Sequence, residues 1–152
     1  MATILVHGAE GSGTTSVVAL LNEYQSKKSN WKVAEWSPSK DSKNAKLCLW
    51  VMSRGRLTKD HEEAYSRLAT LKLPILMVIT RTDVEEDPQQ FWNKNESFIK
   101  GNYPQVIDGF CVCAASAQTV ALIAERFRAI FVQSRRQSGE QLIKRIESLN
   151  IL

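Results

Sequence analysis

Short apolar runs alternate with longer amphipathic stretches along this chain. Three runs are apolar almost throughout and predict strands buried on both faces, at residues 2–7, 45–52 and 73–80. Residues 31–36 alternate between the two faces of a strand, and residues 110–114 form a last short apolar run. The pattern therefore predicts five strands.

The stretches between the strands have the period of helices. About five helices are predicted, at residues 15–26, 60–71, 87–100 and 118–150, the last range being one helix or two. Asp60 and the pair Asp87-Pro88 have the residue types of helix starts. Gly139 predicts a break or a kink within the last, amphipathic helix.

Strands that alternate with helices indicate an α/β fold, here a three-layer sandwich with a mainly parallel five-stranded sheet. A chain of 152 residues, 43% of them hydrophobic, suffices for a single domain over residues 1–152. No apolar run is long enough to span a bilayer, and no charged leader precedes the first strand. Cys48, Cys111 and Cys113 lie inside apolar runs, which indicates buried, reduced thiols. We therefore expect a cytoplasmic protein without a transmembrane segment.

The net charge of +4 is concentrated in the last helix, which is rich in arginine and lysine. Such a helix is compatible with an acidic protein partner or with peripheral contact to a membrane surface. The chain has no basic patch of the aromatic-interleaved kind and no known reader motif, so we expect no nucleic-acid binding.

The first strand ends in a glycine-rich segment, Gly8-Ala9-Glu10-Gly11-Ser12-Gly13-Thr14-Thr15. Its spacing is that of a phosphate-binding loop, G-x-x-x-x-G-K-[S/T], except that Thr14 replaces the lysine. In such a loop, backbone N–H groups and the following helix N-terminus bind phosphate, and the lysine offsets phosphate charge. Thr15 keeps the position of the Mg²⁺-binding hydroxyl. The alternative is a plain strand-to-helix turn, capped by Thr14 or Thr15.

Two further motifs follow later strands. Thr80-Arg81-Thr82-Asp83 resembles the [N/T]-K-x-D motif of P-loop GTPases, in which the aspartate accepts hydrogen bonds from guanine N1 and N2. Arg81 would lie along the base, because a guanidinium plane stacks on rings. Cys113-Ala114-Ala115 resembles the [S/C]-A-[K/L] motif, whose backbone N–H approaches guanine O6. Taken singly, Asp83 is equally suited to capping a turn and Ala114 to the core.

Together the three motifs make nearly the whole chain resemble the P-loop GTPases, a class that includes Ras-like, Era-like and dynamin-like proteins. The resemblance implies a guanine-nucleotide site with Mg²⁺ at Thr15. It also implies the strand order 3-1-4-5-6 in G-domain terms. The usual antiparallel edge strand is expected to be absent, because only residues 27–44 separate the first helix from the next buried strand.

The same interval has no clear counterpart of the switch threonine or of D-x-x-G. Where D-x-P-G would fall, the chain reads Trp36-Ser37-Pro38-Ser39. Asp41 is a candidate displaced metal ligand, and Lys27, Lys28 or Lys40 is a candidate substitute for the lysine. We therefore expect a pseudo-GTPase that binds guanine nucleotide weakly or not at all and acts through a protein partner. The alternative is a guanine-nucleotide-binding protein with slow or partner-assisted GTP hydrolysis.

Two surfaces are expected to contact a partner: residues 36–46 and the basic part of the C-terminal helix, residues 135–152. Trp31 and Trp36 bracket the short second strand. They either anchor this interface or pack beneath neighbouring helices. His7 precedes the glycine-rich loop, but a strand-end histidine at the mouth of a sheet is not expected to carry chemistry.

Overall fold

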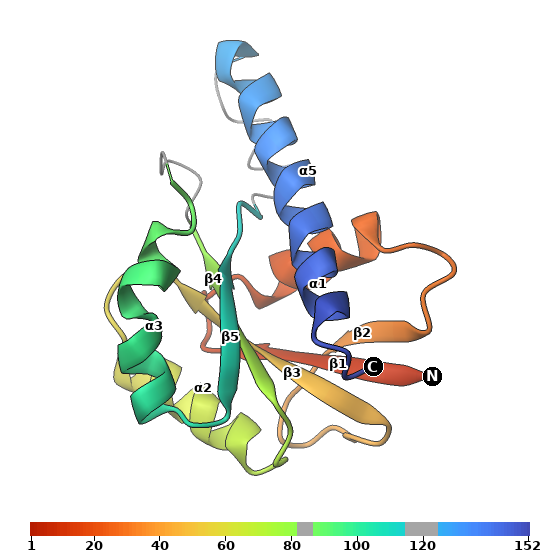
Figure 1. Ribbon diagram of the computed structural model, residues 1–152, viewed down its shortest axis with the longest axis vertical. Coiled ribbons are helices and arrows are strands. Elements are labelled where there is room, and N and C mark those ends of the chain that lie inside the picture. Colours follow the sequence, from red (N-terminus) through yellow and green to blue (C-terminus); the bar gives the residue numbers. More distant parts are fainter. Residues whose placement is uncertain (82–86, 115–124) are drawn as a thin grey trace.

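A parallel five-stranded sheet forms the centre of the molecule (Figure 1). The computed structural model describes residues 1–81, 87–114 and 125–152. The strands are β1 (Ala2–Gly8), β2 (Trp31–Glu35), β3 (Ala45–Ser53), β4 (Ile75–Thr80) and β5 (Val106–Cys111). Their order is β2-β1-β3-β4-β5, and every neighbouring pair is parallel. The predicted α/β fold and strand order are confirmed, and the described part of residues 27–44 contains no antiparallel strand.

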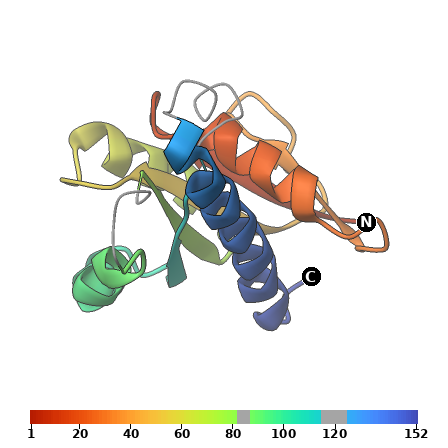
Figure 2. The ribbon, with the colours of Figure 1, turned by 90° about the horizontal axis from the view of Figure 1, so that it is seen from above.

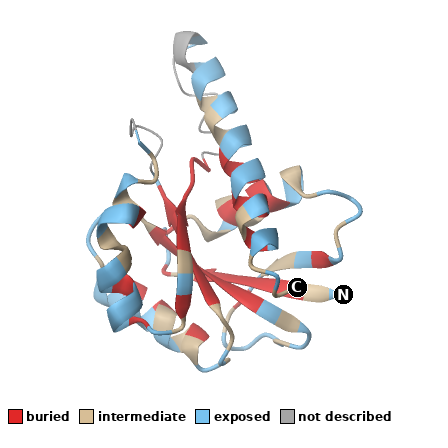
Figure 3. Cartoon of the chain, viewed as in Figure 1, coloured by how far each residue is buried: buried red, intermediate tan, exposed pale blue. Residues whose placement is uncertain are grey.

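In the part of the chain that the structure describes, helices cover both faces of the sheet (Figures 1 and 2). The helices are α1 (Thr14–Tyr24), α2 (Lys59–Ala69), α3 (Gln90–Asn102) and α5 (Glu125–Ser148). Helices α1 and α5 share one core cluster with the sheet, and α2 and α3 contribute to another on the opposite face. The central strands are therefore buried on both sides, as Figure 3 shows, which explains their continuous apolar sequences.

The last strand begins and ends earlier than the sequence pattern predicts. Strand β5 spans Val106–Cys111, whereas the apolar run predicts residues 110–114. Asp108 interrupts the apolar pattern in the first half of β5, so the sequence does not indicate a strand there. In the structure, Oδ2 of Asp108 lies 2.6 Å from Nη1 of Arg145 in α5. A carboxylate is tolerated there because β5 is the edge strand and Asp108 has an ion-pair partner.

Helix starts also differ from the prediction. The N-cap of α2 is Thr58, whose hydroxyl accepts the His61 N–H at 3.4 Å, so Asp60 lies in the first turn instead. Helix α3 begins at Gln90, after a turn in which the Asp87 carboxylate accepts the Gln89 N–H at 3.1 Å. A Ser/Thr/Asp pattern marks the neighbourhood of a cap more reliably than its position.

Helix α5 continues through Gly139 without a break. The glycine is needed for close packing: a Cβ there would lie 2.3 Å from Cδ2 of Tyr24 in α1. The predicted helix of residues 118–150 is confirmed over 125–148, and residues 118–124 lie outside the described part. The first described turns of α5 extend beyond the sheet (Figure 1). No helix in the described residues is long and apolar enough to cross a membrane.

Candidate functional site

The glycine-rich loop connects the carboxyl end of β1 to the first turn of α1. Gly13 is the N-cap of α1 and has φ of 98°, a left-handed conformation that favours glycine. A Cβ on Gly8 would lie 2.4 Å from the carbonyl oxygen of Val51 in β3, so this position requires the close approach of a bare backbone. The Ser12 N–H donates to the Ala9 carbonyl at 3.1 Å, and Ser12 is buried. These contacts give the loop its tight turn ahead of a helix N-terminus.

The end of β4 holds this loop from the other side. The Thr80 hydroxyl donates to the Ser12 carbonyl at 2.6 Å, and Arg81 Nη2 donates to the Gly11 carbonyl at 3.1 Å. Arg81 itself has φ of 62°, which turns the chain sharply at the strand end. The structure therefore brings the first two residues of the Thr80–Asp83 motif into direct contact with the loop. Asp83 lies outside the described residues.

The third motif continues from the end of β5. Cys113 and Ala114 are buried, and the Cys113 N–H donates to the Ser138 hydroxyl of α5 at 2.9 Å. Ala114 belongs to the core cluster beneath α1 and α5, which agrees with the simpler interpretation of this residue. Ala115 lies outside the described residues. The contact of this segment with a base stays a prediction.

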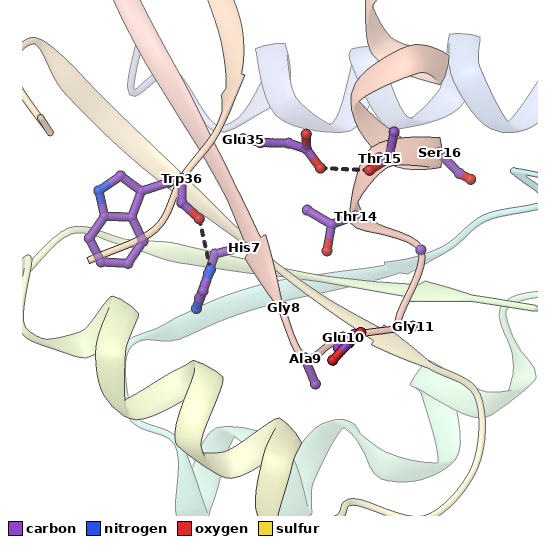
Figure 4. Close-up of a pocket in the computed structure, with 11 residues that line it drawn as sticks. His7, Gly8, Ala9, Glu10, Gly11, Thr14, Thr15, Ser16, Glu35 and Trp36 are labelled. Atoms are coloured by element: carbon purple, nitrogen blue, oxygen red, sulfur yellow. Dashed lines mark hydrogen bonds between the residues drawn. The ribbon is translucent and has the colours of Figure 1, made fainter. Parts of the chain in front are cut away.

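The structure places a carboxylate beside Thr15 that the motif comparison does not predict. The Thr15 hydroxyl donates to Glu35 Oε1 at 2.8 Å (Figure 4). Glu35 is the last residue of β2 and pairs with Val6 of β1, so both strands end at the same edge of the sheet. Matching the chain to D-x-P-G assigns the aspartate position to Trp36, one residue too late. The signal that identifies Glu35 is an acidic residue at the end of the strand beside the loop.

These two oxygens have the chemistry that Mg²⁺ prefers. A hydroxyl and a carboxylate hold the ion in nucleotide sites, and waters and phosphate oxygens complete its coordination. Thr15 and Glu35 therefore fit a Mg²⁺ ion that arrives with a phosphate ligand. The alternative ligand Asp41 accepts the Lys43 N–H at 2.9 Å within the β2–β3 loop and does not line the loop cavity.

The cavity above the loop has an unusual charge for a phosphate site. It measures about 490 Å³. Its lining residues are His7, Gly8, Ala9, Glu10, Gly11, Gly13, Thr14, Thr15, Ser16, Glu35 and Trp36. Within the described part of the chain, the lining contains two carboxylates and neither lysine nor arginine. Thr14 occupies the lysine position, and its hydroxyl lies 3.3 Å from that of Ser12. Of the candidate substitute cations, Lys40 Nζ lies 3.4 Å from the Glu35 backbone carbonyl rather than in this cavity.

His7 has a structural role at the floor of the cavity. Its Nδ1 lies 2.9 Å from the Trp36 carbonyl, and Arg67 Nε donates to its Nε2 at 2.9 Å. An arginine donor requires Nε2 to be the acceptor, so His7 is neutral with its proton on Nδ1. Burial lowers the pKa of His7 below its usual 6.5, and Arg67 lowers it further, against the opposing effect of the Trp36 carbonyl.

Trp31, the first residue of β2, and Trp36, the residue after its end, are core residues. Trp31 is 2% exposed beneath α1 and α5, and Trp36 is 7% exposed on the opposite face. Trp36 meets the His7 ring edge-on, with 5.2 Å between ring centroids. Of the two interpretations that the sequence left open, packing beneath helices is the one that the structure supports.

No family model matches the chain, and no curated protein matches it. It superposes on apo translation elongation factor SelB from Methanococcus maripaludis with a TM-score of 0.54 and 13% identity, over 88% of this chain and 34% of SelB. The SelB complex with the GTP analogue GppNHp gives 0.51 and 12%, over 90% and 34%. A variant of SsGBP gives 0.53 and 15%, over 91% and 56%. The chain thus spans about a third to just over half of these longer chains and shares with them its α/β fold around a parallel sheet.

Proposed function

We propose that this chain is a pseudo-GTPase domain: it keeps the architecture of a guanine-nucleotide site, does not hydrolyse GTP, and acts through a protein partner. The observation that supports this most directly is the charge of the loop cavity. Glu10 and Glu35 line it, and Thr14 stands where the lysine of a working loop would face the β- and γ-phosphates. A triphosphate that enters this cavity meets two carboxylates and, among the described lining residues, no lysine or arginine.

The loss of the lysine alone is costly for nucleotide binding. A charge-assisted hydrogen bond contributes about 1.5–3 kcal/mol. Removing it therefore weakens binding roughly 10- to 150-fold, because about 1.4 kcal/mol corresponds to a factor of ten. Phosphoryl transfer suffers further, since the lysine also stabilises charge that develops in the transition state.

The second candidate is a guanine-nucleotide-binding protein that hydrolyses GTP slowly or with a partner's help. The contact between Thr15 and Glu35 favours it, because the two residues are suited to hold Mg²⁺. When bound, the metal would neutralise phosphate charge and convert the Glu35 carboxylate from a repulsive group into a ligand. The two candidates thus differ in whether the metal compensates for the missing lysine.

A partner would contact the C-terminal helix more readily than the second strand. Trp31 and Trp36 are buried and offer no exposed aromatic anchor. In α5, Ile130 and Val132 are 61% and 51% exposed on turns that extend beyond the sheet. We place the partner surface on this part of α5, together with the polar β2–β3 loop.

Phosphate release from GTP separates the two candidates. The purified protein is incubated with GTP and Mg²⁺, beside Thr15→Ala and Ser16→Ala variants. Ser16 lines the same cavity, and the described structure gives its side chain no hydrogen bond, so it is a matched control. For a pseudo-GTPase, release stays at the buffer rate in all three proteins. Steady release that Thr15→Ala abolishes and Ser16→Ala preserves would overturn the proposal and support the second candidate.

A further inference from the structure

A second cavity, of about 290 Å³, lies between the β2–β3 loop and the C-terminal end of α2. The loop contributes Trp36, Pro38, Lys40 and Ser42, and the helix end contributes Arg67, Thr70 and Leu71. Trp36 lines this cavity and the loop cavity alike. The volume is at the lower end of the range for small-molecule sites, about 300–1,000 Å³.

The charged residues of this lining are both cations. In the part of the chain that the structure describes, neither Lys40 nor Arg67 forms an ion pair. The Arg67 Nε donates to the neutral imidazole of His7, which offers no negative charge in return. A fully buried guanidinium is almost always paired with an anion, and Arg67 is partly buried. The cavity therefore has a positive charge that the protein leaves uncompensated.

The position of Arg67 is suited to anion recognition. Its Nε is occupied by His7, which orients the guanidinium plane, and among the described residues neither terminal nitrogen has a hydrogen-bond acceptor. A carboxylate or phosphate accepts two parallel hydrogen bonds from such a fork. Lys40 adds a flexible second cation from the opposite wall, and the Ser42 hydroxyl adds a hydrogen-bonding group.

Trp36 is the third residue that indicates a ligand in this cavity. Its Nε1 is buried, and no residue in the described structure accepts its hydrogen bond. In Figure 4 the indole lies apart from Thr14 and Thr15, with its nitrogen turned away from them. The Trp36 ring, Pro38 and Leu71 are the apolar residues of a lining that also contains the two cations. A lining that combines apolar residues with cations suits a flat molecule with one negative group.

We propose that this cavity binds a small organic anion, a compound with one carboxylate or phosphate group on a flat apolar body. Arg67 and Lys40 bind the anionic group, and Trp36, Pro38 and Leu71 contact the body. The site adjoins the cavity of the glycine-rich loop, with which it shares Trp36, but its cations line only the second cavity.

The test uses the nucleotide-free protein and the indole N–H resonance of Trp36, assigned with a Trp36→Phe variant. Benzoate is titrated as the carboxylate probe, benzamide as its neutral counterpart of the same shape, and inorganic phosphate as the third probe. Benzoate or phosphate is expected to shift the resonance saturably, and benzamide is not. A response to phosphate without one to benzoate would assign the anionic group to a phosphate.

Three single substitutions identify the residues responsible. Arg67→Met and Lys40→Met are each expected to weaken anion binding at least tenfold, the effect of losing one charge-assisted contact. Lys59→Met is the control, because Lys59 is an exposed cation on the same helix outside the cavity. Thermal melting confirms that each variant is folded, and Lys40 is exposed enough to be replaced safely. Equal binding of benzamide, no response to either anion, or unchanged binding in Lys40→Met would overturn the proposal.

Discussion

Replacing Gly139 by alanine should destabilise the protein, although alanine is the better helix former. The new Cβ would lie 2.3 Å from Cδ2 of Tyr24, 3.0 Å from Cγ and 3.1 Å from Cε2. Carbon atoms in good contact are about 3.5–4.0 Å apart, so the ring or the helix has to move by about 1 Å. Overpacking of this kind costs about 1–3 kcal/mol, against a gain of about 1 kcal/mol in helix propensity.

The expected net loss is therefore up to about 2 kcal/mol. In a domain of this size, each kcal/mol lowers Tm by about 2–4 °C, so the variant should melt up to about 8 °C lower. Thermal and urea unfolding of the wild type, Gly139→Ala, Tyr24→Ala and the double variant measure the effect. Gly101→Ala in α3 is the control, because a Cβ there meets nothing within 4 Å. It should be neutral or stabilise the protein slightly.

The sign of the effect should reverse when the ring is removed. In the Tyr24→Ala background, Gly139→Ala has no ring to displace, so only the helix-propensity gain of about 1 kcal/mol remains. Tyr24→Ala has its own cost, because Arg135 lies over the ring at 5.7 Å from its centroid, and the double-variant cycle subtracts it. If Gly139→Ala stabilises both backgrounds equally, the close approach of α1 and α5 is not the reason for this glycine.

Three further predictions concern the site. The pKa of His7 is lowered in the folded state, so the unfolded chain takes up a proton first as pH falls below 6.5, and stability decreases. Between pH 7.5 and 5.5, Tm should therefore drop less in His7→Gln than in the wild type. An equal drop in the two proteins would contradict this. Thr14→Lys should tighten GDP binding about 10- to 150-fold by calorimetry without producing GTP turnover, whereas unchanged affinity would mean that the loop does not bind phosphate. Asp83→Ala should remove a preference for GDP over ADP while leaving Tm unchanged; retention of that preference would exclude Asp83 from base recognition.

The sequence predicts the sheet well because its strands are buried on both faces. Continuous apolar runs in β1, β3 and β4 have no competing helical interpretation, and the short interval before β3 leaves room for a single strand, β2. Element ends are predicted less well. Asp108 breaks the apolar pattern of β5, yet it is compensated by Arg145 from α5, a contact between residues 37 positions apart. Local pattern contains no information about such a partner.

The sequence likewise predicts one part of the candidate site and misplaces another. Motif spacing correctly indicates that Thr80 and Arg81 lie near the loop, because strand ends in a parallel sheet meet at one edge. It misplaces the carboxylate beside Thr15, because a motif comparison assumes the family's spacing after β2. The register of β2 against β1 determines that Glu35, rather than its neighbour Trp36, is the residue beside the loop.

The backbone of the glycine-rich loop and the charged side chains of its cavity favour different ligands. The backbone of the loop turns tightly into the N-terminus of α1, with Gly13 as the N-cap, and Thr80 and Arg81 donate hydrogen bonds to its carbonyls. Its side chains now favour the opposite charge, because Glu10 and Glu35 line the cavity and Thr14 replaces the lysine. A cation bound at Thr15 and Glu35 is therefore the group on which any affinity for a nucleotide should depend. It follows that nucleotide binding by this domain should require Mg²⁺ more strictly than binding by a loop that contributes its own lysine.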